Sequence, residues 1–323
     1  ITTSFYFFSF NFSFLPNILN TKNMMAVAGM VILGYNLVVG RSGKMSTLFL
    51  ELTVWALLFS LVVYTSVVVN STNDMSYVTY FTTMWVWLSG AYACINIMKW
   101  RHGTVKVETV VWYLAGVCTF QCIISQVIAF NPAVKSFVDT YVNQGQEFLD
   151  NVDRLYGIGA SLDTAGTRFS AVLVMMVSLL ALRDNKKYEV ILMWVMFFVI
   201  TSLGNMIART TIVGVIRSVA FLVFYSMMVP SRDKARVKTI VTWFLSLAIV
   251  AVAIFTILYN TSPIMHENLR FGFEGFFSIV EKGHWETSSN DALLEMIKWP
   301  DNTHTWLIGD GYFVNPGYDP YYT

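Results

Sequence analysis

The chain has 323 residues, of which 55% are hydrophobic and 13% are charged, and its formal net charge is +1. Soluble globular domains carry about 25% charged residues, so this composition excludes an ordinary soluble protein. The apolar blocks are long, continuous and mostly without a period of two, which argues against a membrane β-barrel. The composition therefore predicts an all-α, polytopic transmembrane helical bundle. The near-neutral charge identifies no partner, and no nucleic acid is expected.

Nine apolar spans are predicted in chain order within a single integral membrane domain covering 1–323. They are 5–19, 24–39, 46–69, 78–98, 107–130, 167–182, 188–203, 211–229 and 239–259. Because a crossing takes about 20 residues, the shorter spans must place polar edge residues in the headgroup region or in protein-lined cavities. The chain begins at Ile1 and stops inside a polar, Tyr-rich stretch, so we expect a fragment truncated at both ends, with further helices beyond Thr323.

Basic residues separate the connections between these spans into two classes. Twelve of them occupy every second connection: Arg41, Lys44, Lys99, Arg101, Lys106, Arg183, Lys186, Lys187, Arg232, Lys234, Arg236 and Lys238. Such a bias marks the cytoplasmic side, so the amino end is predicted inside and the long loops 131–166 and 260–323 outside. Loops of this length are usually functional or contain helices of their own.

Arginines near the outer face are the first candidate site residues. They are Arg154, Arg168, Arg209 and Arg270, with Arg217 deeper in span eight. Guanidinium is permanently charged and matches phosphate oxygens bidentately, so one interpretation is a diphosphate clamp. The alternative is interfacial snorkelling for the outer arginines and an intramembrane ion pair for Arg217. An arginine at that depth should face a partner or a wet cavity.

The last loop adds carboxylates and histidines. Glu267, Arg270, Glu274 and Glu281 fall at offsets of 0, 3, 7 and 14, which on one helix gathers them on one face. Glu274 is then a general base or an orienter of Arg270, or simply one half of an exposed i, i+4 pair. His266, His284 and Asp310 are further base candidates; His284 and Asp310 are also predicted to contact substrate.

Several chemistries find no support in the pattern. The stretch GRSGK at 40–44 has Val38 where a P-loop needs its first glycine, and no DxD pair is present for a metal-bound nucleotide sugar. The spacings between His266, His284 and His304 match no compact zinc motif, and Cys118 with Cys122 is better explained as small core thiols than as a disulfide or metal pair. No metal and no cofactor are therefore predicted.

Three stretches resemble the O-antigen polymerase and O-antigen ligase superfamily. They are RLYGIGASLDTAGTRFSAVLVMM at 154–176, GNMIARTTIVGVI at 204–216 and WLIGDGYF at 306–313. The segment 269–323 is similar to the outer loop of polymerase-like proteins from the Bacteroidetes group. The resemblance covers about half of the chain, from Arg154 onward.

The resemblance implies an all-helical (GT-C-like) membrane glycosyltransferase that polymerises polyprenyl-diphosphate-linked repeat units on the periplasmic face of the bacterial inner membrane. Arg154 and Arg209 match the family positions that bind the diphosphate, while Arg168 and Arg270 are added by location alone. Lipid-linked oligosaccharides as donor and acceptor, membrane lipids and a chain-length regulator are the expected partners. Ligases of the superfamily carry a functional histidine after a motif like IGDGYF, and its absence here favours a polymerase.

Developing charge on the leaving diphosphate is expected to dominate catalysis, because electrostatic stabilisation is usually the largest catalytic term. Arg154 and Arg209 therefore rank first, Arg217 and Arg270 next, and Glu274 is the preferred base. The lipid tail is expected in a groove between spans. Two alternatives stay open: an O-antigen ligase, and a non-enzymatic lipid-oligosaccharide flippase or transporter, although the spans carry few of the buried carboxylates typical of transporters.

Overall fold

The computed structural model describes residues 1–39, 47–144, 149, 154–230, 233–287, 290, 293–294, 297, 299–300 and 302–312. Several sequence predictions concern residues outside this set, namely the GRSGK stretch with Arg41 and Lys44, and Arg232. The chain divides into two compact units. Unit 1 comprises residues 1–21 and 98–283, and unit 2 comprises residues 22–97 and 284–323.

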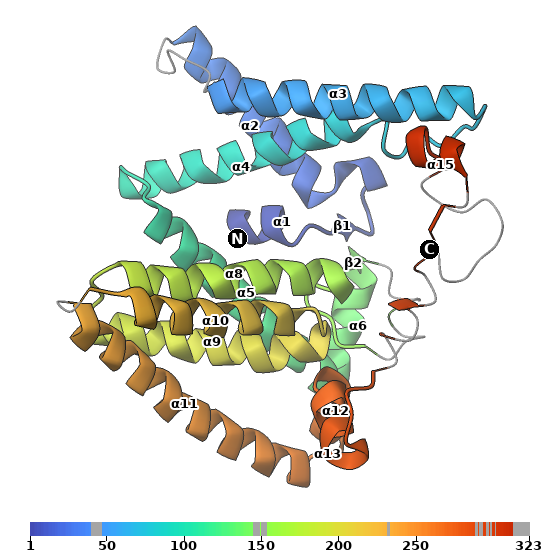
Figure 1. Cartoon of the computed structure of the whole chain (residues 1–323). Helices are drawn as coiled ribbons and strands as arrows, with labels where there is room; N and C mark the ends of the chain where they lie inside the picture. The colour runs from blue at the N-terminus through green and yellow to red at the C-terminus, as the bar shows by residue number, and fades with distance from the viewer. Residues whose placement is uncertain are drawn as a thin grey trace. The chain divides into compact units, whose positions relative to one another are not determined.

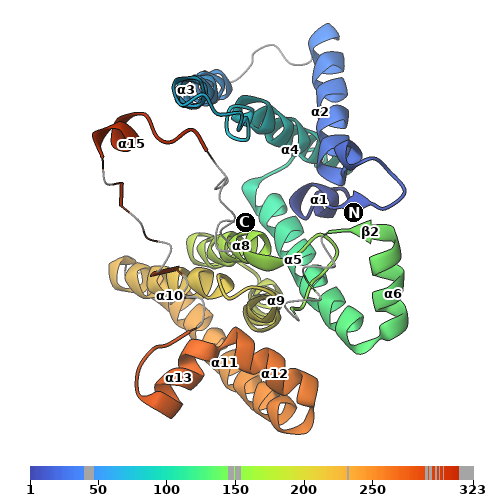
Figure 2. The ribbon, with the colours of Figure 1, turned by 90° about the vertical axis from the view of Figure 1, so that its right-hand side faces the viewer.

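Unit 1 contains most of the long helices. Its elements are α1 (Thr2–Phe7), β1 (Asn11–Phe12), a 3₁₀ turn (Asn17–Leu19), α5 (Val107–Phe130), α6 (Pro132–Tyr141), β2 (Val142–Asn143), α8 (Leu162–Leu182), α9 (Lys187–Ile207), α10 (Thr211–Met228), α11 (Lys234–Thr261), α12 (Pro263–Gly272) and α13 (Glu274–Lys282). Helices α8, α9 and α10 lie side by side (Figures 1 and 2), and α9 also contacts α5, α11 and α12. Beyond α11, the short helices α12 and α13 pack beside its end.

The core of unit 1 forms around α8 and α9. Phe169, Leu173 and Met176 of α8 and Trp194 and Phe197 of α9 are almost completely buried. Their spacing of three or four residues places each set on one helix face. Burial of these faces fixes how α8 and α9 pack on each other. The connections at both ends of the two helices are positioned as a result.

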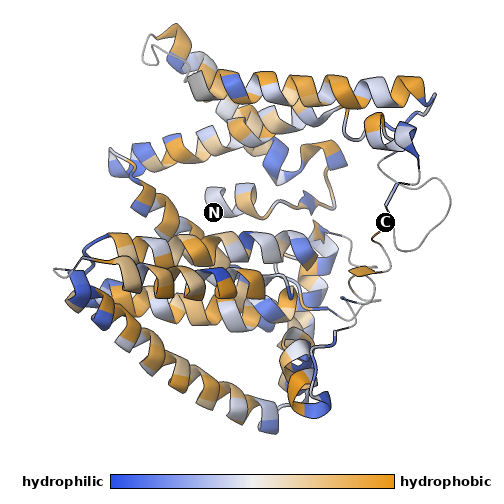
Figure 3. Ribbon diagram, in the orientation of Figure 1, coloured by the Kyte–Doolittle hydropathy of each residue, from blue (hydrophilic) through white to orange (hydrophobic). Residues whose placement is uncertain are grey.

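Six helices in the described part of the chain are long and apolar enough to cross a membrane. They are Phe49–Val69, Val107–Phe130, Leu162–Leu182, Lys187–Ile207, Thr211–Met228 and Lys234–Thr261. Figure 3 shows α11 hydrophobic along most of its length, with hydrophilic residues where α10 connects to α11 and at α13. The chain is thus a mostly helical membrane protein, as predicted. The predicted spans 24–39 and 78–98 also form helices, but these two are not among the six.

The first predicted span, 5–19, does not form a membrane helix. Helix α1 ends at Phe7, and the chain then runs through β1 to the 3₁₀ turn. Strand β1 pairs antiparallel with β2, with Asn11 opposite Asn143 and Phe12 opposite Val142. The sequence FSFNFSF at 8–14 repeats phenylalanine with a period of two, which is the period of a strand and not of a helix. The block is apolar throughout, so its hydropathy alone does not reveal this alternation.

Unit 2 consists mainly of α2 (Thr21–Val38), α3 (Thr47–Val69) and α4 (Tyr80–His102), together with α15 (Thr303–Leu307). The end of α3 holds the glycine-rich motif that follows α15. The Asn70 side-chain amide donates to the carbonyl of Gly309 at 2.9 Å, and the Thr72 hydroxyl donates to the carbonyl of Gly311 at 2.6 Å. Both glycines have positive φ, 80° and 74°, a conformation that side chains with a Cβ rarely adopt.

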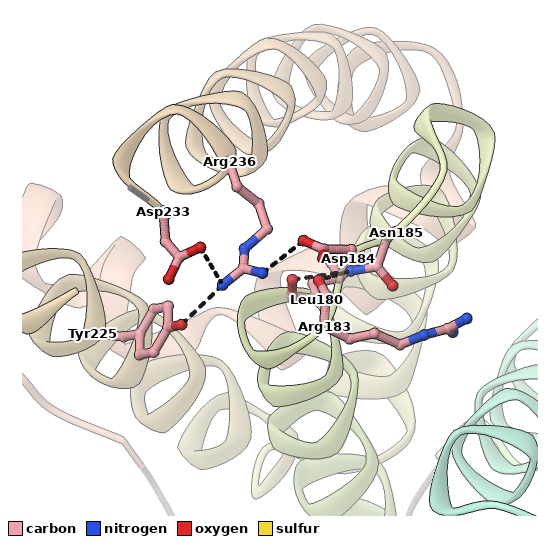
Figure 4. A network of polar contacts seen from close by, with 7 residues as sticks. All are labelled: Leu180, Arg183, Asp184, Asn185, Tyr225, Asp233 and Arg236. Carbon is pink, nitrogen blue, oxygen red and sulfur yellow. Dashed lines mark hydrogen bonds and ion pairs between the residues drawn. The ribbon is translucent and has the colours of Figure 1, made fainter. Parts of the chain in front are cut away.

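One end of unit 1 is joined by a polar network (Figure 4). Arg236, near the beginning of α11, donates to Asp184 Oδ1 at 2.8 Å and to the Tyr225 hydroxyl at 3.2 Å, and lies 3.7 Å from Asp233 Oδ1. We call this region, where α8 and α10 end and α9 and α11 begin, the Arg236 end. The network connects three helices through one guanidinium. At the opposite end of the same helices lie the two arginines that the sequence ranks first.

Candidate active site

The segment Arg154–Ala160 is held in place by two glutamines. Gln121 of α5 accepts from the backbone N–H of Ile158 at 2.8 Å and donates to its carbonyl at 2.9 Å. Gln144 accepts from the N–H of Gly159 at 2.6 Å and donates to the carbonyl of Gly157 at 3.0 Å. A segment without regular structure must find such partners for its backbone when it is buried. The glutamines therefore fix the path of the chain immediately after Arg154.

The glycines of this segment are required by close packing. A Cβ at Gly157 would collide with the Gln121 side chain, and one at Gly159 would lie 2.6 Å from the carbonyl oxygen of Phe8. Gly159 also has φ of +75°. The RLYGIG motif thus combines an arginine with the glycines that let its segment pass between α1 and α5.

The stretch 204–211 positions the second arginine and binds α12. Asn205 donates to the carbonyl of Gly272 at 2.6 Å, and Arg209 Nε donates to the carbonyl of Phe271 at 3.0 Å. The last carbonyls of a helix have no partner within that helix, so these two side chains satisfy the carboxyl end of α12. The connection between α9 and α10 is therefore locked to α12.

Arg154 and Arg209 meet at one aromatic ring. The guanidinium carbon of Arg209 lies 4.0 Å from the centroid of the Phe271 ring, and that of Arg154 lies 4.8 Å from it. We call these two residues the arginine pair. Arg209 Nη1 also lies 2.5 Å from Glu274 Oε2. Within the described part of the chain Glu274 is the one carboxylate that forms an ion pair with either arginine.

Burial lowers the pKa of Arg209, the Glu274 carboxylate raises it, and the positive charge of Arg154 lowers it. Guanidinium remains protonated under such conditions. Two guanidiniums that approach one ring form a donor set that matches phosphate oxygens.

A cavity of about 470 Å³ adjoins the arginine pair. It is lined by Ser125, Ile128, Ala129, Lys135, Arg154, Leu155, Tyr156, Ile264, Glu267, Asn268 and Phe271. Arg154 of the pair and Phe271, the ring that both arginines contact, belong to this wall. The cavity mixes charged, amide and aromatic side chains, as ligand pockets do.

An apolar groove of about 500 Å³ lies between α9, α11, α12 and α13. Its lining includes Phe198, Phe255, Leu269, Phe273, Phe276, Phe277 and Val280. Phe273 joins α12 to α13 and directly precedes Glu274. The groove thus begins one residue away from the carboxylate that pairs with Arg209.

The predicted association of Glu274 with Arg270 is wrong. Helix α12 ends at Gly272 and a new helix begins at Glu274, so the offsets that assumed one helix do not continue across Phe273. Arg270 instead donates to both carboxylate oxygens of Glu281, at 2.8 and 3.0 Å. Hydrogen bonding to Glu281 raises the pKa of Arg270 and lowers that of Glu281. Arg270 is therefore neutralised by its own partner.

Arg168 points to a different side of α8 from the arginine pair. Gly166 and Ser170 face the connection between α9 and α10, where the Ser170 hydroxyl donates to the Thr210 carbonyl at 2.7 Å. Position 168 is two residues from each, about 200° around a helix of 3.6 residues per turn. Its guanidinium lies over Phe7 and Phe8 of α1, at 5.9 and 5.6 Å from the ring centroids.

Arg217 does not have the environment predicted for it. Its side chain is exposed on α10, and the described part of the chain supplies no ion-pair partner for it. The depth argument predicted a partner or a wet cavity. In the structure the buried face of α10 consists of Thr211, Gly214, Ser218 and Leu222.

His284 and Asp310 belong to unit 2, whereas the arginine pair and Glu274 belong to unit 1. His284 Nε2 lies 3.2 Å from Glu286 Oε2, and Asp310 accepts from the Thr305 hydroxyl at 2.7 Å. His266, in unit 1, stacks on Tyr259 with ring centroids 4.0 Å apart. These contacts are structural, and the roles predicted for the three residues remain predictions.

Sequence reasoning missed the residues that assemble the pair, namely Phe271, Gln121, Gln144 and Asn205. Glutamine and asparagine within apolar helices were a usable signal, because a buried amide requires partners. Comparisons of the chain with models of known families, with curated proteins and with solved structures find no match. The arrangement is therefore interpreted from its own geometry.

Proposed function

We propose that this protein is a membrane glycosyltransferase that polymerises polyprenyl-diphosphate-linked oligosaccharide units on the outer face of the bacterial inner membrane. The observation that carries the proposal is the convergence of Arg154 and Arg209 on Phe271. The two arginines are 55 positions apart in sequence (209 − 154) and come from different connections. Two guanidiniums at one ring favour a ligand with two adjacent negative charges, such as a diphosphate.

The proposed reaction requires positive charge where the diphosphate leaves. A sugar hydroxyl attacks the anomeric carbon, forming the new glycosidic C–O bond while the bond from that carbon to the diphosphate oxygen breaks. The leaving diphosphate keeps the electron pair, and the hydroxyl proton passes to a base, for which Glu274 is our candidate. Donors fixed in advance at the position of developing charge are the largest source of catalysis in such sites.

The apolar groove between α9, α11, α12 and α13 supports a polyprenyl substrate. Its phenylalanine and aliphatic lining suits a branched hydrocarbon chain, and its position next to Glu274 would leave the diphosphate near Arg209. The polar cavity on the other side of α12 contacts Arg154. An apolar and a polar recess beside one pair of cations match a ligand with a lipid tail, a charged linker and a sugar.

The direct test gives the full chain, purified and reconstituted in vesicles, a lipid-linked repeat unit with no other acceptor. A polymerase makes longer lipid-linked chains. Arg154→Ala and Arg209→Ala should abolish this extension, whereas Arg101→Ala, an exposed arginine elsewhere in unit 1, should not. Failure of the wild type to extend the unit while it transfers glycan to a lipid A acceptor would favour a ligase. Movement of the unit across the membrane without new bonds would favour a flippase.

A further inference from the structure

Helix α12 presents two distinct stripes. One stripe is buried inside unit 1 and consists of Met265, Leu269 and Gly272. The other lines the cavity next to the arginine pair and consists of Ile264, Glu267, Asn268 and Phe271. The second set has spacings of 3, 1 and 3 residues, which on a helix form one continuous face. This face of α12 therefore forms one wall of the cavity.

The opposite walls of the cavity supply complementary chemistry. Lys135 comes from α6, and Arg154 and Tyr156 come from the segment that Gln121 and Gln144 hold. The Tyr156 hydroxyl donates to Asp139 at 2.7 Å, which fixes its ring. Cations, a carboxylate, an amide and two aromatic rings thus surround one space.

Two polar side chains in this cavity are uncommitted. Within the described part of the chain, the Glu267 and Asn268 side chains have neither a hydrogen-bond nor an ion-pair partner. Glu274, by contrast, is paired with Arg209, and Glu281 with Arg270. Glu267 is thus the carboxylate of α12 and α13 that is positioned to accept from a ligand.

We propose that this cavity is a saccharide-binding subsite, in which Glu267 and Asn268 bind sugar hydroxyls and Phe271 and Tyr156 pack against the apolar face of the ring. A carboxylate at the wall disfavours an inorganic anion, and the charged lining disfavours a hydrocarbon chain. The volume of about 470 Å³ lies within the range of small-molecule sites, roughly 300 to 1,000 Å³. The inference rests on the proposed function in one respect: the group next to the bound sugar is taken to be its diphosphate, which Arg154 would contact.

The test is saturation-transfer NMR on the full chain in detergent, with glucose, galactose, N-acetylglucosamine and N-acetylgalactosamine as probes at millimolar concentration. At least one of these sugars should receive magnetisation from the protein. Glu267→Ala and Asn268→Ala should each weaken its binding by about tenfold, the effect of losing a hydrogen bond of roughly 1.4 kcal/mol. Glu281→Ala, which removes a carboxylate outside the cavity, serves as the matched control and should leave binding unchanged.

Binding of undecaprenyl diphosphate, which carries no sugar, separates this inference from the proposed function. Its affinity should fall in Arg209→Ala and stay at the wild-type value in Glu267→Ala and Asn268→Ala. Sugar binding that needs Glu267 in a protein that ignores undecaprenyl diphosphate would support the subsite and overturn the proposed function. The absence of transfer to all four sugars, or equal transfer in wild type and the two cavity variants, would overturn the subsite.

Discussion

The two ends of the helical bundle in unit 1 use arginine in opposite ways. At the Arg236 end, one guanidinium contacts Asp184, Asp233 and the Tyr225 hydroxyl, and Arg183 pairs with Glu108. At the other end, Arg154 and Arg209 approach one ring, and among the described residues Glu274 pairs with Arg209. Each of the two arginines named at the Arg236 end has at least one carboxylate partner, whereas the arginine pair is defined by the ring that both members contact.

This difference shows how a structural arginine can be told from a candidate binding arginine. A guanidinium surrounded by carboxylates connects helices and has little capacity left for a ligand. Two guanidiniums that approach the same ring can together bind an anion that has several oxygens. Charge count by loop cannot distinguish these cases, because both ends contain arginines.

The largest effect is expected when one arginine from each end is replaced and the two variants are compared. Arg209→Ala should reduce chain extension on the order of 10²- to 10³-fold, the loss typical of removing one donor to a developing charge. Arg236→Ala should leave the rate per folded molecule unchanged. The measurement is the initial rate of lipid-linked chain extension, normalised to the folded fraction. Equal losses in the two variants would erase the distinction between the ends.

The next effect concerns the support of Arg154. Gln121→Met removes both bonds to Ile158 and leaves a buried N–H and carbonyl unpaired, at a cost of about 1 to 3 kcal/mol each. The free energy of unfolding should therefore fall by about 2 kcal/mol or more, with a loss of extension because Arg154 is no longer fixed. Gln126→Met provides the control on the same helix, since both polar atoms of that amide are buried without a hydrogen-bond partner among the described residues. It should be neutral or stabilising, as measured by thermal or denaturant unfolding.

A smaller effect is expected at the Arg236 end. Arg236→Ala should lower the free energy of unfolding by about 1 kcal/mol, because Asp184 is exposed and its ion pair is screened by solvent. Arg236→Lys should recover part of this loss but not the fork that reaches both Asp184 and Tyr225. If the free energy of unfolding is the same in wild type and Arg236→Ala, and high salt does not change it, the network contributes nothing measurable.

The smallest effect is a pH dependence at α13. Arg270 lowers the pKa of Glu281 below its ordinary value, so the unfolded state binds a proton more readily than the folded state. The contribution of the pair is fully present above the unfolded carboxyl pKa of about 4.3 and is lost as pH falls through the folded value. Amide exchange of α13 should rise in that acid window in the wild type. In Glu281→Gln it should already be high at neutral pH and change little on acidification.

The membrane class and several helices were predictable because they depend on local composition. The spans at 107–130, 188–203 and 211–229 correspond closely to α5, α9 and α10, since apolar runs of this length form helices wherever they lie. The predicted span at 5–19 was wrong, because the alternation of phenylalanines favours extended backbone over helix. The charge sorting placed Arg154 and Arg209 among four arginines near the outer face, and the structure brings these two to one ring.

The partners of these arginines were not predictable from spacing. Glu274 was assigned to Arg270 on the assumption of an unbroken helix, and the break at Phe273 turned it toward Arg209 instead. The depth of Arg217 predicted a partner or a wet cavity, and the structure leaves its side chain exposed. Both errors concern which face of an element a neighbour covers, and a single sequence does not state this.

The amino-acid sequence by itself determined the class of the protein, the long apolar helices and the residue types available for chemistry, because hydrophobicity and charge act at each position locally. Only the tertiary structure decided that Phe271, carried by α12, would bring Arg154 and Arg209 together and that Glu267 would face a cavity beside them. The physical reason is that these contacts join segments separated by tens of residues. Their geometry follows from the burial of α8, α9 and α12 against each other, and not from any local pattern.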